Sequence, residues 1–243
     1  MFGVYLIADL YIKILYKEEF TKNYLKDYFV DSNYFDFEIS VLDEEISNMQ
    51  KENSEIPYEM IESLCLYSKI CNRILNEYDG FLFHASAISV NGNAYLFTAP
   101  SGTGKSTHVK LLSELLKDKM TYINDDKPII RYIKSENKFY VYGTPFDGKH
   151  RLSNNIKSPL KSICLLTRGE EAKIKKTNMI NVLKYLIRQT LRWDTERAKE
   201  NYFELLNKMS TCVDFYVLEC NKDISSAVCS YEGMIKGDNN EDS

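Results

Sequence analysis

A glycine- and serine-rich segment carries the clearest chemical signal in this chain. Residues 99–106 read A-P-S-G-T-G-K-S, which matches the phosphate-binding pattern G-x-x-x-x-G-K-[ST] except that Ala99 replaces the first glycine. Gly102 and Gly104 allow the backbone to turn successive N–H groups towards a phosphate. A turn that only caps a helix is the alternative interpretation. A strand-like run before the segment and a helix-like run after it favour a phosphate site.

The residues after these glycines have the side chains that a bound nucleotide requires. The ammonium group of Lys105 can reach the β- and γ-phosphates, and the hydroxyl of Ser106 can bind Mg²⁺. The N-terminus of the helix expected to begin near Lys105 adds the positive end of its dipole. The predicted nucleotide contacts are Ser101, Gly102, Thr103, Gly104, Lys105, Ser106 and Thr107.

Titratable side chains at three other positions are candidates for the chemistry. His84 lies in the apolar run FLFHASAISV that leads towards the loop. It is either a packed core residue or a group near the γ-phosphate that hydrogen-bonds the phosphate or the attacking atom. Asp125 and Asp126 end the run MTYINDD, where aspartate is also a common turn residue. Because adjacent strand residues face opposite ways, only one carboxylate is expected to point at a metal ion unless the strand has already ended.

A polar segment later in the chain has the length of a functional loop. Residues 143–155, GTPFDGKHRLSNN, contain Lys149, His150 and Arg151 in succession. In an acidic protein, such a cluster suits an anionic substrate or the charge of a transition state. A solvated loop without a function is the alternative. Arg151 is the residue of this loop that we select as a catalytic candidate.

Strand-like and helix-like runs alternate along the chain, which predicts an α/β fold with a mixed central sheet and flanking helices. Helices are predicted at 19–28, 54–80, 106–117, 179–192 and 195–209, with one more near the C-terminus. Strands are predicted at 2–16, 36–43, 81–90, 94–99, 120–126, 128–133, 138–143, 162–168 and 213–220. We divide the chain into an N-terminal α/β extension packed on the core (1–79), a phosphate-loop core (80–235) and a disordered acidic tail (236–243).

Composition excludes several classes of partner. The net charge of -4 and the pI of about 5.6 argue against a nucleic acid or an acidic membrane surface, since both select basic proteins. No run approaches the roughly 18 to 20 apolar residues that span a bilayer.

The six cysteines form no C-x-x-C pair and lie in apolar runs, so we expect all six to be reduced core residues. The expected compartment is the cytoplasm.

These features together resemble the HPr kinase/phosphorylase catalytic domain and its relatives in the phosphoenolpyruvate carboxykinase superfamily. The resemblance rests on the loop core SGTGKST (101–107), on His84 in a hairpin leading into the loop, and on the pair Asp125–Asp126 about twenty residues after Lys105. It covers roughly residues 80–170. The family pattern also has a glycine directly after the histidine and an LRG signature, and neither is found here. Serine-phosphorylated HPr is therefore not the expected substrate.

The resemblance implies an ATP- and Mg²⁺-dependent phosphotransferase that moves the γ-phosphoryl group to a hydroxyl of a small molecule or to a peptide serine. By analogy, Asp125 is the base for the accepting hydroxyl, Asp126 and Ser106 bind Mg²⁺, and His84, Lys105 and Arg151 assist catalysis. ATP or another purine nucleotide is the expected cofactor, and a homo-oligomer is expected. A non-catalytic nucleotide-sensing module is the main alternative. A carboxykinase-type lyase is disfavoured because carboxykinases are about twice this length.

Overall fold

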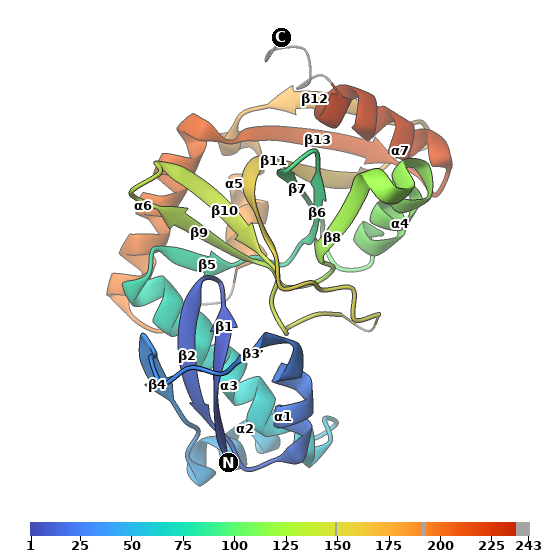
Figure 1. Ribbon diagram of the computed structural model, residues 1–243. Coiled ribbons are helices and arrows are strands. Elements are labelled where there is room, and N and C mark those ends of the chain that lie inside the picture. The colour runs from blue at the N-terminus through green and yellow to red at the C-terminus, as the bar shows by residue number, and fades with distance from the viewer. Residues whose placement is uncertain (149, 191–192, 237–243) are drawn as a thin grey trace.

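The computed structural model describes residues 1–148, 150–190 and 193–236. Its N-terminal part folds around a small four-stranded sheet in the order β3-β1-β2-β4, drawn in blue in Figure 1. Residues 2–16, predicted as a strand or a hairpin, form a hairpin, because Ala8 and Asp9 both have positive φ and reverse the chain tightly. The strands of this sheet are β1 (Phe2–Ile7), β2 (Leu10–Leu15), β3 (Phe29–Val30) and β4 (Phe37–Ile39).

Three helices cover the small sheet. They are α1 (Glu19–Leu25), which is followed by the 3₁₀ turn η1 (Lys26–Tyr28), α2 (Asp43–Glu52) and α3 (Tyr58–Glu77). The sequence analysis predicted α1 and α3 but missed α2. Ile46 is the only buried residue of α2, and the helix is polar overall, so it offers few apolar residues to detect. Its start is fixed instead by the Glu45 carboxylate, which accepts a hydrogen bond from the Leu42 N–H at 2.8 Å.

Nine strands form the main sheet, which curls around the centre of the molecule. Seven of them follow the order β5-β9-β10-β11-β7-β6-β8, and β13 pairs with β11 on one side and β12 on the other. The pairs β7–β11 and β11–β13 are parallel and the others are antiparallel. The strands are β5 (Gly80–Leu82), β6 (Ser86–Val90), β7 (Asn93–Thr98), β8 (Met120–Asn124), β9 (Ile129–Ile133), β10 (Lys138–Tyr142), β11 (Lys157–Arg168), β12 (Lys173–Thr177) and β13 (Asp214–Cys220).

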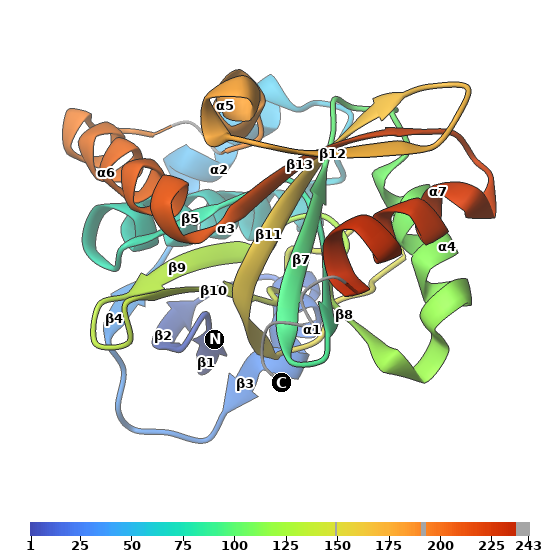
Figure 2. The same ribbon diagram turned by 90° about the horizontal axis from the view of Figure 1, so that it is seen from above.

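Helices lie on both faces of this sheet, as Figures 1 and 2 show from two directions. One face is covered by α4 (Lys105–Leu116), with η2 (Lys117–Lys119) after it, and by α7 (Ile224–Ser230), with the π turn η3 (Tyr231–Lys236) after it. The other face is covered by α5 (Met179–Arg188) and α6 (Glu196–Cys212). Along β11 the side chains alternate accordingly, since Ile163 and Leu165 pack towards α5 and α6 while Cys164 and Leu166 pack towards α4. The prediction of a mixed sheet with flanking helices is confirmed.

The N-terminal part shares its hydrophobic core with the main sheet. Leu82, Ile129 and Phe146 belong to the same buried cluster as the interior of the small sheet and α3. The guanidinium group of Arg131 donates to the Ala8 carbonyl at 2.5 Å and to the Tyr78 carbonyl at 3.1 Å. Helices α1 and α3 are therefore held against the strands that carry the candidate site.

The predictions for the six cysteines and for the C-terminal tail have different outcomes. Cys212 is exposed at the end of α6, so the prediction that all six cysteines are core residues is wrong for this one. Its helix turn points the thiol to solvent, where it donates to the Lys208 carbonyl. The predicted tail, 236–243, lies outside the described residues apart from Lys236. None of the helices in the described part of the chain combines the length and apolar character needed to cross a membrane.

Candidate functional site

The glycine-rich loop connects β7 to α4 with the local geometry that the sequence predicts. Gly102 and Gly104 have φ values of 75° and 116°, which residues with a side chain rarely adopt. The Gly104 carbonyl accepts from the His108 N–H at 2.9 Å, so the helix starts directly at the end of the loop. Ala99 is fully buried and is not among the residues with positive φ, so the backbone does not require glycine at this first position.

Three charged or titratable side chains meet beside this loop. Nε2 of His84 lies 3.2 Å from Nζ of Lys105 and 3.1 Å from Oδ1 of Asp126. One nitrogen serves only one of these partners at a time. With a hydrogen on Nε2 it donates to Asp126, and without one it accepts from Lys105. The structure thus brings together the lysine, the histidine and one aspartate that the sequence analysis selected.

His84 is not in the middle of a strand as predicted. The run 81–90 is two strands, because β5 pairs with β9 whereas β6 pairs with β7 and β8, and the chain changes neighbours between them. His84 lies at this break. Its N–H donates to the Gln189 carbonyl at 2.7 Å, and its carbonyl accepts from the Thr98 hydroxyl at 3.0 Å. These bonds to the end of α5 and the end of β7 fix the backbone that aims the imidazole at the site.

Asp125 and Asp126 follow the end of β8, so the alternation of a strand no longer separates them. Asp125 is 6% exposed, and its Oδ1 accepts from the Ser86 hydroxyl at 2.6 Å. The Asp126 side chain is 24% exposed and also lies 3.5 Å from Nζ of Lys127. One carboxylate is therefore deep in the site and the other is at its mouth.

Asn124 positions this pair and was missed by the sequence analysis. Its Oδ1 accepts from the backbone N–H groups of Asp126 at 2.8 Å and Lys127 at 2.6 Å, which forms a side-chain turn. Its amide group donates to the Thr144 carbonyl at 3.1 Å. Asn124 thus shapes the turn that carries both aspartates and ties it to the 143–155 loop. An Asn directly before two aspartates at a strand end was the available signal.

Burial and neighbouring charges shift the pKa values of Lys105 and Asp126. Burial lowers the pKa of Lys105, and the charges of Asp126 and Asp125 partly oppose that change. Burial alone would raise the pKa of Asp126, but its hydrogen bond with His84 and the charge of Lys127 outweigh burial and leave that pKa below its ordinary value. Asp126 is therefore an ionised carboxylate at neutral pH.

The donor groups near the loop fit one kind of metal ion. Ser106 is exposed in the first turn of α4, and Asp125 and Asp126 supply carboxylates. Among the described residues, no cluster of three or more His, Cys, Asp or Glu side chains could enclose a metal. Mg²⁺ is usually held by one or two protein oxygens together with substrate phosphates and water, so a hydroxyl and a carboxylate match its requirements.

A cavity of about 550 Å³ opens beside the glycine-rich loop. Its wall includes Gly102, Thr103 and Thr107 on the loop side and Arg168 and Lys222 on the other. The Arg168 guanidinium donates to the Gly102 carbonyl at 2.7 Å, so the end of β11 supports the loop directly. The cavity has room for the rest of a nucleotide whose phosphates lie on the loop.

The 143–155 loop lies at the rim of the site. Gly148 approaches Asp126, because a Cβ added to Gly148 would lie 3.5 Å from the Asp126 Cβ. Arg151 has a φ of 49°, and its guanidinium lies 5.8 Å from the centre of the Tyr24 ring. In the described part of the chain, no hydrogen bond or ion pair joins Arg151 to the Lys105–His84–Asp126 group. His150 is exposed, and Lys149 lies outside the described residues.

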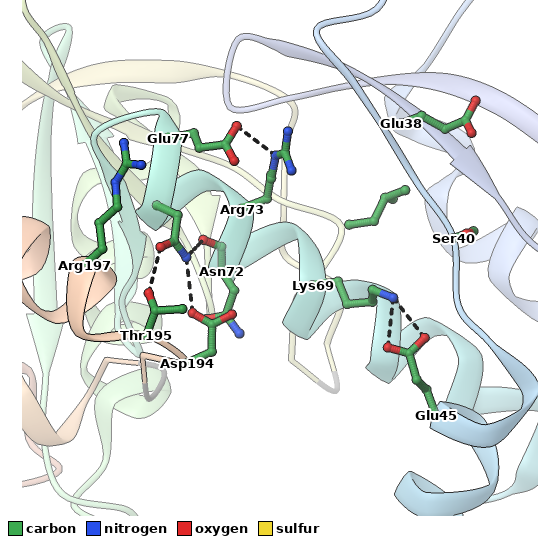
Figure 3. Close-up of a pocket in the computed structure, with 12 residues that line it drawn as sticks. Glu38, Ser40, Glu45, Lys69, Asn72, Arg73, Glu77, Asp194, Thr195 and Arg197 are labelled. Atoms are coloured by element: carbon green, nitrogen blue, oxygen red, sulfur yellow. Dashed lines mark hydrogen bonds and ion pairs between the residues drawn. The ribbon is translucent and has the colours of Figure 1, made fainter.

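A larger cavity lies elsewhere. It measures about 630 Å³ and lies between β4, α2, α3 and the start of α6, as Figure 3 shows. Many of its polar groups are already partnered, since Lys69 is paired with Glu45 and Arg73 with Glu77. Neither the glycine-rich loop nor His84 nor the aspartate pair lines it. We therefore place the candidate site at the loop, although this cavity is the larger one.

Comparisons with known proteins give distant structural likenesses and no match in sequence. No protein-family model matches the chain, and no curated protein matches it in sequence. Among solved structures, the chain is similar to the Hpr(Ser) kinase/phosphatase from Coxiella burnetii, with a TM-score of 0.34 and 10% sequence identity over 65% of this chain and 94% of that one. A likeness of this size carries no argument about activity. The interpretation of the site rests on its own geometry.

Proposed function

We propose that the protein is an ATP- and Mg²⁺-dependent phosphotransferase that moves the γ-phosphoryl group to a hydroxyl of a small molecule or a peptide. The observation that carries this proposal is the contact group formed by Lys105, His84 and Asp126 at the end of the loop, with distances of 3.2 and 3.1 Å to the imidazole nitrogen. A nucleotide-binding module needs the lysine but not a carboxylate held ready at the same point. A phosphoryl transfer needs both.

In the proposed reaction the loop N–H groups and Lys105 hold the β- and γ-phosphates. The acceptor hydroxyl gives its proton to a carboxylate, its oxygen forms a bond to the γ-phosphorus, and the bond from that phosphorus to the bridging oxygen of ADP breaks. Mg²⁺, held by Ser106 and a carboxylate, would offset the negative charge of the phosphates. His84 is placed to donate a hydrogen bond to a phosphoryl oxygen once the nucleotide separates it from Asp126.

The division of roles between the aspartates follows from their exposure. By analogy, the sequence assigned the base to Asp125 and the metal to Asp126. A base must reach a hydroxyl that arrives from solvent, and Asp126 has the more exposed side chain, whereas Asp125 is 6% exposed and already accepts from Ser86. We therefore propose the reverse order, with Asp126 as the base and Asp125 as the metal ligand.

A screen of hydroxyl compounds and serine peptides with ATP and Mg²⁺, followed by mass spectrometry, tests the proposed activity. We expect at least one product that has gained a phosphoryl group, and we expect Lys105→Ala to give none. An enzyme stabilised by ATP·Mg²⁺ that phosphorylates nothing in the screen would instead favour a nucleotide-sensing module.

A further inference from the structure

A second, smaller cavity lies on the acceptor side of the aspartate pair. It measures about 210 Å³ and is bounded by α1, α3 and the 143–155 loop. Four of the ten residues that line it are aromatic. Tyr67 and Phe146 pack edge to face with centroids 4.7 Å apart, and Phe20 stacks on Tyr24 at 5.8 Å. Leu64 completes the apolar wall on α3. An apolar cavity of about 150 Å³ is known to hold benzene, so this one has room for a single aromatic ring or an aliphatic group of that size.

Lys127 connects the cavity to the reacting groups. Lys127, the residue after Asp126, lines it, and its Nζ lies 5.2 Å from the centre of the Tyr67 ring and 3.5 Å from Oδ2 of Asp126. Burial first, and then the charges of Cys71 and Asp126, raise the pKa of Tyr67. Lys127 thus bridges the cavity wall and the carboxylate at the mouth of the site.

The surface of the wall is mainly apolar, and the polar side chains that line it are those of Tyr24, Ser63, Tyr67, Lys127 and Asp147. The hydroxyl of Ser63 already donates to the Met60 carbonyl at 2.7 Å. Lys127 and Asp147 are the charged residues of the lining, and both belong to the segments that flank the aspartate pair. A polyol has no apolar group to place against this mainly apolar surface and therefore gains little from contact with it.

We propose that this cavity is the acceptor-recognition subsite and that it takes an apolar, ring-sized group of the phosphoryl acceptor, whose hydroxyl then lies at Asp126. The inference rests on the proposed phosphotransferase function and adds the acceptor class. Two kinds of acceptor combine a hydroxyl with such a group: a small alcohol with an aromatic or branched apolar group, and a serine peptide with a bulky apolar neighbour. Sugars and other polyols are not the expected acceptors.

Four probe acceptors and γ-labelled ATP with Mg²⁺ test this inference. They are 2-phenylethanol against glycerol, and N-acetyl-Ser-Phe-amide against N-acetyl-Ser-Gly-amide. Because burying a phenyl ring stabilises the complex substantially, we expect the apolar member of at least one pair to be phosphorylated about tenfold faster or more. The pair that shows the preference identifies the source.

Variants of Leu64 connect the preference to the cavity. Leu64→Trp fills the space and should abolish the preference while ATP·Mg²⁺ still stabilises the protein. Leu64→Ala enlarges the cavity and should shift the preference towards 2-naphthylethanol, which keeps the test valid if the tryptophan variant does not fold. Ile180→Trp, on a 68% exposed position of α5, is the matched control and should change neither rate.

Equal rates within each pair, faster transfer to glycerol, or a preference that survives in Leu64→Trp would overturn the inference. So would transfer to none of the four probes by a protein that ATP·Mg²⁺ stabilises, a result that leaves nucleotide binding intact. If the proposed function itself were wrong, the result would be different: ATP·Mg²⁺ would not stabilise the wild-type protein at all.

Discussion

The most quantitative prediction concerns His108, which lies on α4 directly behind the glycine-rich loop. It is 2% exposed, and its ring centre is 4.9 Å from that of Phe97. Nε2 lies 3.0 Å from the Ser230 hydroxyl on α7, while Nδ1 has no hydrogen-bond partner among the described residues. Burial lowers the pKa of His108 from 6.5 to about 4, because the apolar surroundings disfavour the charged imidazole.

The direction of the pH effect follows from this lowered value. Between about pH 4 and pH 6.5 the unfolded chain binds a proton at His108 and the folded chain does not. The free energy of unfolding is therefore unaffected by His108 above pH 6.5 and falls as the pH drops through this window. The full loss below both values is about 3 kcal/mol, of which about 2 kcal/mol falls between pH 7 and pH 5.

His108→Phe isolates this contribution. The new ring can pack against Phe97, and the Ser230 hydroxyl keeps its bond to the Ala227 carbonyl at 3.1 Å. Urea unfolding at pH 7 and pH 5 should show a pH-dependent loss that is about 2 kcal/mol smaller in the variant than in the wild type. The exposed His150 provides the control, since His150→Phe should leave the wild-type loss unchanged. An equal loss in wild type and His108→Phe would refute the reasoning.

Two further predictions concern the site itself. Lys105→Ala should remove most of the stabilisation by ATP·Mg²⁺, which is about 2.7 kcal/mol at a ligand concentration of one hundred times Kd. Lys110→Ala, on the exposed face of the same helix, should keep that stabilisation. Equal melting shifts in both variants would rule out the loop as the phosphate site. Arg151→Ala should raise the KM for the acceptor several-fold and leave the ATP affinity unchanged, because its guanidinium lies over the ring of Tyr24, which lines the proposed acceptor cavity. A parallel loss of ATP affinity in titrations would contradict this position.

The local pattern of the glycine-rich loop predicted its geometry well, because the relevant constraints are short-range. Gly102 and Gly104 adopt the positive φ values that their residue type allows, and the helix begins where the pattern ends. The hairpin that leads into the loop is present as β6 and β7, and Asn91 and Gly92 in its turn both have positive φ. These features depend on a few adjacent residues and on no distant partner.

Features that depend on distant partners were not predictable in the same way. The break at His84 arises because β5 and β6 pair with different strands, and the apolar run itself carries no sign of it. Strand β12, with three lysines among its five residues, exists because it pairs with β13 at the edge of the sheet. The small cavity between α1, α3 and the 143–155 loop brings Phe20 and Leu64 to Phe146 across the chain, and only the folded arrangement shows this.

The most direct test of the proposed chemistry compares Asp126→Asn with Asp125→Asn, using γ-labelled ATP and an acceptor found in the screen. We expect Asp126→Asn to bind ATP·Mg²⁺ as the wild type does and to transfer phosphoryl groups about 10² to 10⁴ times more slowly, because the amide cannot take the acceptor's proton. Asp125→Asn should instead require a higher Mg²⁺ concentration, since an amide is a weaker ligand for this cation. If Asp126→Asn transferred phosphoryl groups to the same acceptor at the wild-type rate, that result would contradict the account.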